Sequence, residues 1–228
     1  MERFTTPQKA DVSNNIFTEG LNYFEHGKGS IWGSDDPQMV KLIKNNVLGG
    51  KWLNLGSGDG RYNSVLLELS DSLVALDIDK GALSKLWHDA PKKLRDKLKM
   101  TVADATKGLP FENETFDGVF CDSFLHMFPN EVSAKIIFEI NRVIKSKGKL
   151  IFEFATETER VFLGEGEYYK KQSTSHKLSE TKAMIQTCLS NFNLDIQMYE
   201  IKNLKYKPRD VEYLFSGKIL LVVGTKNK

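Results

Sequence analysis

The chain is poor in cysteine and proline and contains no long apolar run. Two cysteines and six prolines occur in 228 residues. Cys121 and Cys188 lie far apart and form no CxxC motif, which predicts two buried thiols in a reducing compartment rather than a disulfide framework. No stretch reaches the ~20 apolar residues that span a bilayer, and the first residues lack the apolar region of a secretory signal. We therefore expect a cytoplasmic protein without a membrane span.

An excess of one charge is also missing. Thirty-two Lys and Arg nearly balance thirty Asp and Glu, which leaves a formal net charge of +2. This balance provides no global positive field for a nucleic-acid partner. Two local basic clusters remain. The cluster at 92–99 has helical periodicity and is interpreted as a solvated face, whereas the cluster at 202–209 fits a phosphate-binding loop and an ordinary surface loop equally well.

The order of the predicted elements favours an α/β fold in one main domain. From residue 49 to about 154, short apolar runs alternate with amphipathic stretches. This alternation is typical of βαβ units, in which a parallel sheet is covered by helices on both faces. The predicted strands are 51–55, 73–77, 98–102, 116–121 and 149–154, and the predicted helices are 38–47, 61–69, 80–88, 130–144 and 179–190.

Both ends of the chain depart from this alternation. Residues 1–48 are rich in aromatic side chains and are expected to form a helical cap that helps to bind substrate, with Asp36 capping its helix. The main domain, 49–228, is expected to carry an insertion at about 156–178. Two strand-like runs near the C-terminus, 195–201 and 218–224, follow each other without a helix. They predict an antiparallel pair at the edge of the sheet.

Three predicted strands end in residues that suit a nucleoside ligand. The first runs into LGSGDGR at residues 55–61, and such strand ends are where open α/β sheets bind ligands. Its GxGxG spacing, followed by Arg61, differs from the GxGxxG dinucleotide fingerprint and fits a ligand without a pyrophosphate. Asp77 ends the second strand, where a carboxylate can accept hydrogen bonds from both ribose hydroxyls. Asp104 ends the third and is placed to hold an adenine amino group, while Asp79 is expected to cap the following helix.

In these motifs the sequence resembles the class I S-adenosylmethionine (SAM)-dependent methyltransferase family, especially its small-molecule and quinone-type branch. Residues 53–60, LNLGSGDG, are similar to the family's glycine loop, Asp77 to its ribose-binding acid and Asp104-Ala105 to its adenine-side pair. Residues 109–117 and 142–150 are similar to the family's entries into its fourth and fifth strands. The resemblance covers about residues 50–155.

The resemblance implies a doubly wound, mostly parallel, seven-stranded sheet in the order 3-2-1-4-5-7-6, with strand 7 antiparallel and helices on both faces. It also implies that SAM is bound, that its methyl group passes to an acceptor and that S-adenosylhomocysteine (SAH) is released. Asn54 replaces the acid usual before the glycines; because an amide still accepts a hydrogen bond, altered rather than lost cofactor binding is expected. The implied cofactor-binding residues are Asn54, Gly56, Ser57, Gly58, Gly60, Asp77, Ile78, Asp104, Ala105 and Asp122.

The acceptor side is predicted from isolated residues. His126 follows the fourth strand, where a catalytic base and a packing residue are both open interpretations. Glu153 in the fifth strand is equally open as a buried structural carboxylate or a functional one. Tyr23 and Trp32 are predicted to cover the substrate pocket, because a cationic sulfonium favours aromatic faces, with ordinary core packing as the alternative. Tyr168 is predicted to bind substrate because it lies in the insertion expected to shape the acceptor pocket. No metal is predicted, since the four histidines lack ligand spacing.

The predicted activity is therefore methyl transfer to an acceptor, with a small molecule favoured. Three alternatives stay open. The same fold can act on RNA or protein, which the basic residues at 202–209 suggest. The chain can also be a SAM-binding module without catalysis, which only Asn54 suggests. A nicotinamide oxidoreductase is disfavoured by Arg61 at the position of the third fingerprint glycine.

Overall fold

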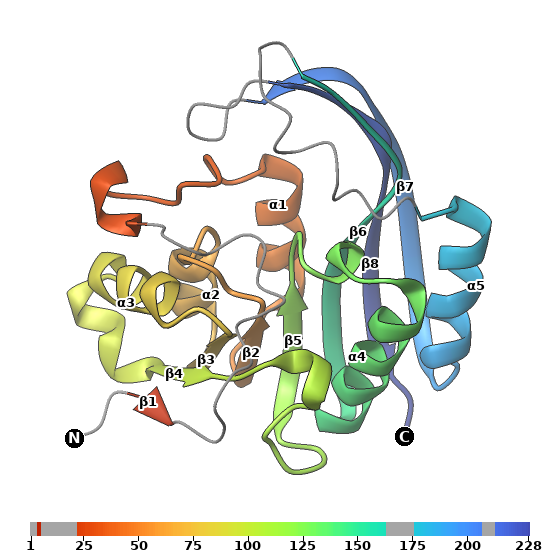
Figure 1. Ribbon diagram of the computed structural model, residues 1–228. Helices are drawn as coiled ribbons and strands as arrows, with labels where there is room; N and C mark the ends of the chain where they lie inside the picture. Colours follow the sequence, from red (N-terminus) through yellow and green to blue (C-terminus); the bar gives the residue numbers. More distant parts are fainter. Residues whose placement is uncertain (1–3, 6–21, 163–175, 207–212) are drawn as a thin grey trace.

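One mixed sheet carries helices on both of its faces (Figure 1). The computed structural model describes residues 4–5, 22–162, 176–206 and 213–228. The strands are β1 (Phe4–Thr5), β2 (Lys51–Leu55), β3 (Ser72–Asp77), β4 (Leu98–Val102), β5 (Phe116–Cys121), β6 (Ile144–Phe162), β7 (Phe192–Tyr206) and β8 (Tyr213–Lys226). The helices are α1 (Pro37–Asn46), α2 (Asn63–Leu69), α3 (Lys80–Asp89), α4 (Asn130–Val143) and α5 (Leu178–Cys188), with short 3-10 helices η2 (Tyr23–His26), η3 (Lys92–Lys97), η4 (Ala105–Lys107) and η5 (Leu125–Met127).

The strand order confirms the predicted topology. The sheet runs β1-β4-β3-β2-β5-β6-β8-β7, so the seven predicted strands, β2 to β8, stand in the order 3-2-1-4-5-7-6. β8 pairs antiparallel with both β6 and β7, as predicted. The sequence did not predict β1, which adds a parallel edge beside β4. Two residues are too few to show the period of a strand, and this explains the omission.

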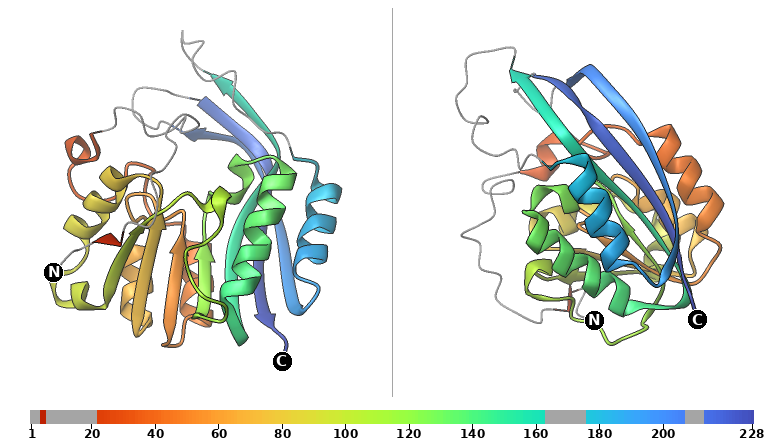
Figure 2. Two further views of the ribbon diagram at one scale, coloured as in Figure 1. Left: turned by 60° about the horizontal axis from the view of Figure 1, so that its bottom comes forward. Right: turned by 90° about the vertical axis from the view of Figure 1, so that its right-hand side faces the viewer.

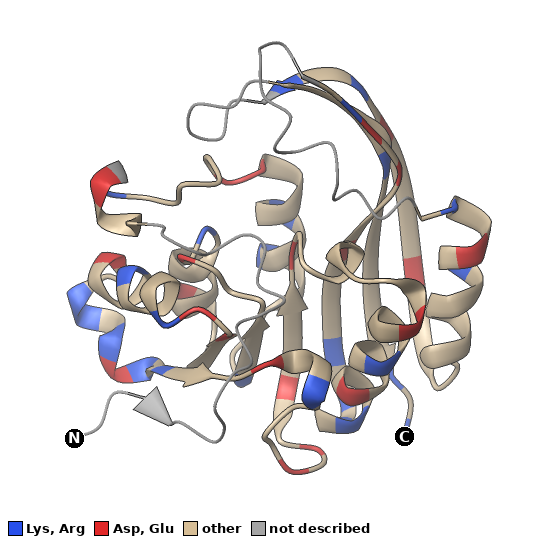
Figure 3. Ribbon diagram, viewed as in Figure 1, with Lys and Arg blue, Asp and Glu red and all other residues tan. Residues whose placement is uncertain are grey.

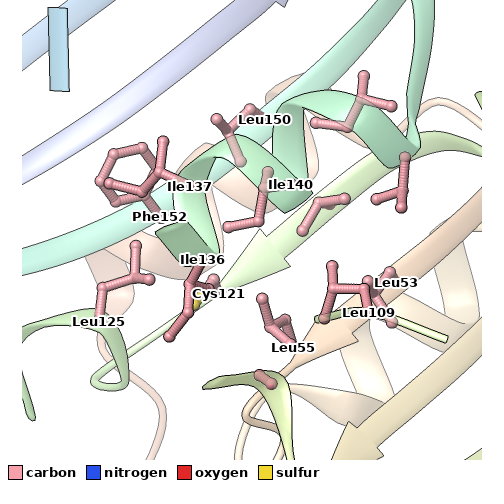
Figure 4. Packing of buried hydrophobic residues seen from close by; sticks show 14 of the residues in the cluster. Leu53, Leu55, Leu109, Cys121, Leu125, Ile136, Ile137, Ile140, Leu150 and Phe152 are labelled. Carbon is pink, nitrogen blue, oxygen red and sulfur yellow. The ribbon is translucent and has the colours of Figure 1, made fainter. Parts of the chain in front are cut away.

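Two apolar clusters hold the helices against the sheet. α4 and α5 pack on one face, where Ile136, Ile137 and Ile140 point toward Cys121 and Phe152 (Figure 4). α1, α2 and α3 pack on the opposite face. Cys121 and Cys188 are buried free thiols, which agrees with the prediction. Within the described residues, no helix has the length and apolar character needed to cross a membrane.

Local capping positions the helices next to the strand ends. The Asp36 carboxylate accepts the N–H groups of Gln38 and Met39, with Pro37 in the first turn of α1. Asp79 likewise accepts the N–H groups of the first turn of α3. Both caps were predicted, because Asp is a preferred N-cap residue and proline fits the first helical turn. The basic stretch at 92–97 forms η3, which has no buried residue and lies beside β4 at one edge of the molecule (Figure 3).

The last three strands are much longer than predicted. β6, β7 and β8 continue beyond the other strands and curve over toward α1, forming an extension that we call the arm, residues 156–162, 201–206 and 213–218 (Figures 1 and 2). Register shifts at Thr156/Glu159 and Ile201/Leu204 bend it, and Glu157 and Asn203 there adopt positive φ. Residues 156–162 of the expected insertion therefore continue β6, while 163–175 lie outside the described residues.

Candidate functional site

The loop between β2 and α2 is shaped by its glycines. The φ angles of Gly56, Gly58 and Gly60 are 66°, 51° and 93°, all in the region that L side chains avoid. A Cβ on Gly56 would lie 2.4 Å from Cγ of Phe124. Only glycine fits at this position, because both the backbone conformation and the neighbouring ring exclude a side chain.

Asp77 connects this loop to the end of β3. Its Oδ2 accepts the N–H of Gly58 at 2.8 Å, and its Oδ1 accepts the N–H of Asp79 at 2.9 Å. Burial raises the pKa of Asp77 to about 6, although the backbone N–H groups oppose this rise by stabilising the ionised form. Each carboxylate oxygen has two lone pairs and so keeps the capacity to accept a further donor.

The end of β4 lies beside the end of β3. The N–H of Ala103 donates to the backbone oxygen of Asp77 at 3.0 Å. Asp104 caps η4 by accepting the N–H of Thr106 at 3.0 Å and its hydroxyl at 2.6 Å. Ala105 is buried, and Ile78 is half-buried. The structure thus brings the glycine loop, Asp77 and the Asp104 region to one edge of the sheet, as the sequence predicted.

Two further predicted residues lie within or just before the glycine loop. Asn54 is buried in β2, where it pairs with Ala75 of β3 and Phe120 of β5. The N–H of Ser57 donates to the oxygen of Leu76 at 3.0 Å. Its buried hydroxyl has no hydrogen-bond partner within the described part of the chain. A buried hydroxyl without a partner is unfavourable, so Ser57 is suited to receive a polar ligand group.

Asp122, directly after the end of β5, and Glu153, within the neighbouring strand β6, lie side by side, and we call them the carboxyl pair. The β5–β6 register pairs Cys121 with Phe152, which places the following two acids level with each other. Oδ2 of Asp122 is 4.0 Å from a guanidinium nitrogen of Arg61, and the Ser123 hydroxyl lies 3.5 Å from Oε1 of Glu153.

The carboxyl pair retains a proton near neutral pH. Burial raises the pKa of Asp122 to about 6, against the opposing charge of Arg61. Burial and the charge of Asp122 together raise the pKa of Glu153 to about 8. A site of this kind can donate or accept a proton in the physiological range.

His126 lies in η5, on the other side of β6 from Glu153. Its ring meets Phe154 edge-on at 6.2 Å, and side chains of adjacent strand residues point to opposite faces. Burial, with the charges of Arg160 and His176, lowers the pKa of His126 to about 4. Its imidazole is therefore neutral at neutral pH and only weakly basic. The backbone oxygen of His126 also faces Nε2 of His176 at 3.0 Å, which fixes the turn.

The predicted aromatic residues lie beside the first strands of the sheet. Tyr23 is buried, and its hydroxyl donates to Oδ2 of Asp79 at 2.8 Å. Trp32 is 41% exposed, and its indole nitrogen lies 3.7 Å from where a Cβ on Gly58 would stand. Tyr168 lies outside the described residues. Tyr23 and Trp32 are thus next to the glycine loop and β3 rather than next to the carboxyl pair.

Sequence reasoning did not single out Asp59, Arg61 or the pairing of Asp122 with Glu153. Asp59 is 3% exposed in the glycine loop, where a variable position gives no indication of its partners. Arg61 was noted only because it replaces a glycine. The β5–β6 register brings the carboxyl pair together, and a single sequence does not contain that register.

Comparison with known proteins identifies the fold and the domain. Residues 53–152 match the family model described as a methyltransferase domain. The chain superimposes on a SAM-dependent methyltransferase from Methanosarcina mazei with a TM-score of 0.63 and 17% identity, covering 86% of this chain and 99% of that one. Residues 53–152 thus form a methyltransferase domain, and the chain has the fold of the class I SAM-dependent methyltransferases.

Two other comparisons extend this result. The methyltransferase fold is shared with DhpI, solved as a complex with SAH, at a TM-score of 0.58 and 16% identity, covering 82% of this chain and 81% of that one. An uncharacterized protein of Haemophilus influenzae is 39% identical over 77 residues, or 33% of this chain. The match spans only about 30% of that relative's length. Within the methyltransferase domain, the glycine loop and Asp77 occupy the first two strand ends.

Proposed function

We propose that the chain binds SAM along the ends of β2, β3 and β4 and transfers its methyl group to a small-molecule acceptor. The observation that carries this proposal is the joining of Asp77 to the glycine loop through the N–H of Gly58. The hydrogen bond aligns a carboxylate with a loop whose glycines have positive φ angles and in which the Cβ position of Gly58 is free of close contacts. SAH in the DhpI complex supports the choice of cofactor.

The residues along this edge fit the parts of the cofactor in order. Asp77 accepts the ribose hydroxyls, with Ile78 beside it. Asp104 and Ala105 bind the adenine, and Asp104 already has a well-oriented carboxylate through Thr106. The loop around Gly56, Gly58 and Gly60 receives the methionine end together with Asn54, Ser57 and Asp122.

Methyl transfer requires little acid–base chemistry from the protein. SAM supplies an activated methyl group on a sulfonium, so the chain mainly has to orient the acceptor and exclude water. His126 was the proton acceptor predicted from the sequence and stays a candidate. The carboxyl pair is a second candidate, since its pKa values of about 6 and 8 suit proton transfer at neutral pH.

The acceptor is proposed to bind under the segments that lie outside the common core of the fold. These are the cap of residues 1–48, with Tyr23 and Trp32, and the insertion at about 156–178 with Tyr168. The arm curves over the same edge of the sheet as α1 (Figure 1). A small molecule is favoured because the charge balance is nearly neutral, and a cytoplasmic location remains our expectation.

Calorimetry on the purified protein tests the cofactor assignment. SAM and SAH are expected to bind, whereas NAD and NADP at the same concentrations are not. Binding of NAD alone, or of none of the four, would reject the proposal. An acceptor screen with radiolabelled SAM then follows, with small metabolites before tRNA. Salt-dependent affinity for tRNA would favour the RNA methyltransferase alternative over the small-molecule acceptor.

A further inference from the structure

The segment that crosses over the glycine loop is held almost entirely by polar contacts. We call residues 28–36 the strap. Most of its residues are exposed, and a cavity of about 500 Å³ lies between the strap, residues 59–64 and the C-terminal end of α3. Because no residue of the strap is fully buried, its hydrogen bonds largely decide where it lies.

The strap is attached at four points, and three of them belong to residues 59–62. At its start, the oxygen of Gly29 accepts from buried Lys85, whose partner Asp89 accepts the N–H of Gly29. In the second attachment, Asp59 accepts hydrogen bonds from Ser30 and Ile31. In the third, the Arg61 guanidinium donates to the backbone oxygen of Ser34. In the fourth, the Tyr62 hydroxyl oxygen accepts the N–H of Asp36. The strap is thus joined to Asp59, Arg61 and Tyr62, a short stretch at the end of the glycine loop.

Asp59 makes the closest of these attachments. Its Oδ1 accepts the hydroxyl of Ser30 at 2.6 Å, and its Oδ2 accepts the N–H of Ile31 at 2.7 Å. The hydroxyl oxygen of Ser30 in turn accepts the N–H of Trp32 at 3.1 Å. A carboxylate buried to this degree is unfavourable unless it is hydrogen-bonded, and both of its oxygens are engaged by the strap.

These bonds fix a tight turn that presents Trp32. The N–H of Gly33 donates to the backbone oxygen of Ser30, and Gly33 has a φ of 101°. Ile31 and Trp32 therefore occupy the centre of the turn. Asp59 accepts hydrogen bonds from Ser30 and Ile31, the first two residues of this turn. The turn places the indole of Trp32 beside Gly58, the residue whose N–H Asp77 accepts.

We propose that Asp59 is a positioning residue that binds the strap to the glycine loop and holds Trp32 beside Gly58, so that cofactor binding and ordering of the strap stabilise each other. The coupling to cofactor binding rests on the proposed SAM site, whereas the attachment of the strap by Asp59 does not. A ligand that orders the glycine loop lowers the cost of ordering the strap, and the reverse holds equally. Nothing in this arrangement requires Asp59 to touch the cofactor.

Hydrogen exchange in the free protein tests the attachment. Asp59→Asn and Asp59→Ala are compared with Asp96→Asn, a matched change of an exposed acid in η3. Both Asp59 variants should lose at least about tenfold of the amide protection in the peptide that contains Ile31 and Trp32, because the loss of a charge-assisted bond has that effect. Peptides from β5 should keep wild-type protection, as a check that the core remains folded.

Cofactor coupling is tested with SAH and tryptophan fluorescence. A Trp87→Phe background leaves Trp32 and the buried Trp52 as reporters. SAH is expected to change the emission of Trp32, an effect that Trp32→Phe removes. In the Asp59 variants, the SAH affinity should fall at least about tenfold, and the emission change at saturation should be reduced.

The outcomes separate the two proposals. Unchanged exchange of the strap in both Asp59 variants would overturn the attachment. Weakened attachment with wild-type affinity and emission change would overturn the coupling. Failure of the wild-type protein to bind SAH would reject the proposed function and with it the coupling, while the exchange experiment would still decide whether Asp59 positions the strap.

Discussion

Removing the carboxylate of Asp77 should weaken cofactor binding strongly while the protein stays folded. We predict that Asp77→Ala weakens SAH binding, because the carboxylate is the proposed acceptor for both ribose hydroxyls. The same change also leaves the N–H groups of Gly58 and Asp79 without their partner. Asp77→Asn is the matched variant, since an amide of the same size keeps one acceptor oxygen.

The expected magnitude follows from the number of bonds lost. A hydrogen bond to a charged group contributes about 1.5–3 kcal/mol. Loss of two such bonds to the ribose therefore removes roughly 3 kcal/mol or more, which weakens the affinity about a hundredfold. Asp77→Asn should lie between the wild type and Asp77→Ala.

The pH dependence of binding gives an independent check. Burial raises the pKa of Asp77 to about 6, from the 3.8 of an aspartate in water. Its ionisation therefore opposes folding. The stability that protonated Asp77 contributes is fully present below pH 3.8 and is lost as the pH rises through about 6. Ribose hydroxyls donate better to the ionised form. SAH affinity should thus fall as the pH is lowered through about 6, by up to about tenfold per pH unit.

Calorimetry between mildly acidic and neutral pH measures both effects, with circular dichroism to confirm that each variant is folded. SAH itself carries no group that titrates in this window, whereas Asp122 does. The Asp77→Asn variant therefore isolates the contribution of Asp77. An unchanged SAH affinity in folded Asp77→Ala would refute the assignment of Asp77 as the ribose-binding acid.

Two further predictions concern the carboxyl pair and the glycine loop. Burial raises the pKa of Glu153 from 4.5 to about 8, so its ionisation opposes folding as the pH rises through this range. Glu153→Gln should therefore raise Tm at alkaline pH and leave it unchanged at acidic pH. Scanning calorimetry tests this, with roughly 2–4 °C expected per kcal/mol, and equal Tm differences at both pH values would contradict it. Gly56→Ala should lower both Tm and SAH affinity, since its Cβ would lie 2.4 Å from Phe124. Phe124→Ala in the same chain should restore part of the stability lost; no recovery would point to backbone strain alone.

The sequence indicated the central strands and their ligand-bearing ends for a local physical reason. β2, β4 and β5 have the predicted bounds, because buried strands are short, mostly apolar runs bounded by polar or glycine residues. Asp36 and Asp79 were recognisable as caps from their place before helical stretches. In each case the information lies within a few consecutive residues.

The arm shows where local patterns were insufficient. Residues 156–162, 201–206 and 213–218 contain charged residues and register shifts, so their alternation of polar and apolar residues is interrupted. Pairing with neighbouring strands stabilises them as strands nonetheless, and Ile201, Tyr213 and Phe215 belong to the apolar cluster that also contains α1. These contacts join residues far apart in the chain, and a local pattern does not report them.

The sequence by itself determined the succession of the central strands along the chain, the glycine loop, and the presence of acids at the ends of β3 and β4, since each depends on neighbouring residues. Only the tertiary structure decided which side chains meet across the sheet. Parallel register places Asp122 beside Glu153, burial shifts their pKa values, and the fold of the strap brings Ser30 and Ile31 to Asp59. Burial and long-range contact arise only when distant segments pack together, and they set the electrostatics of the site.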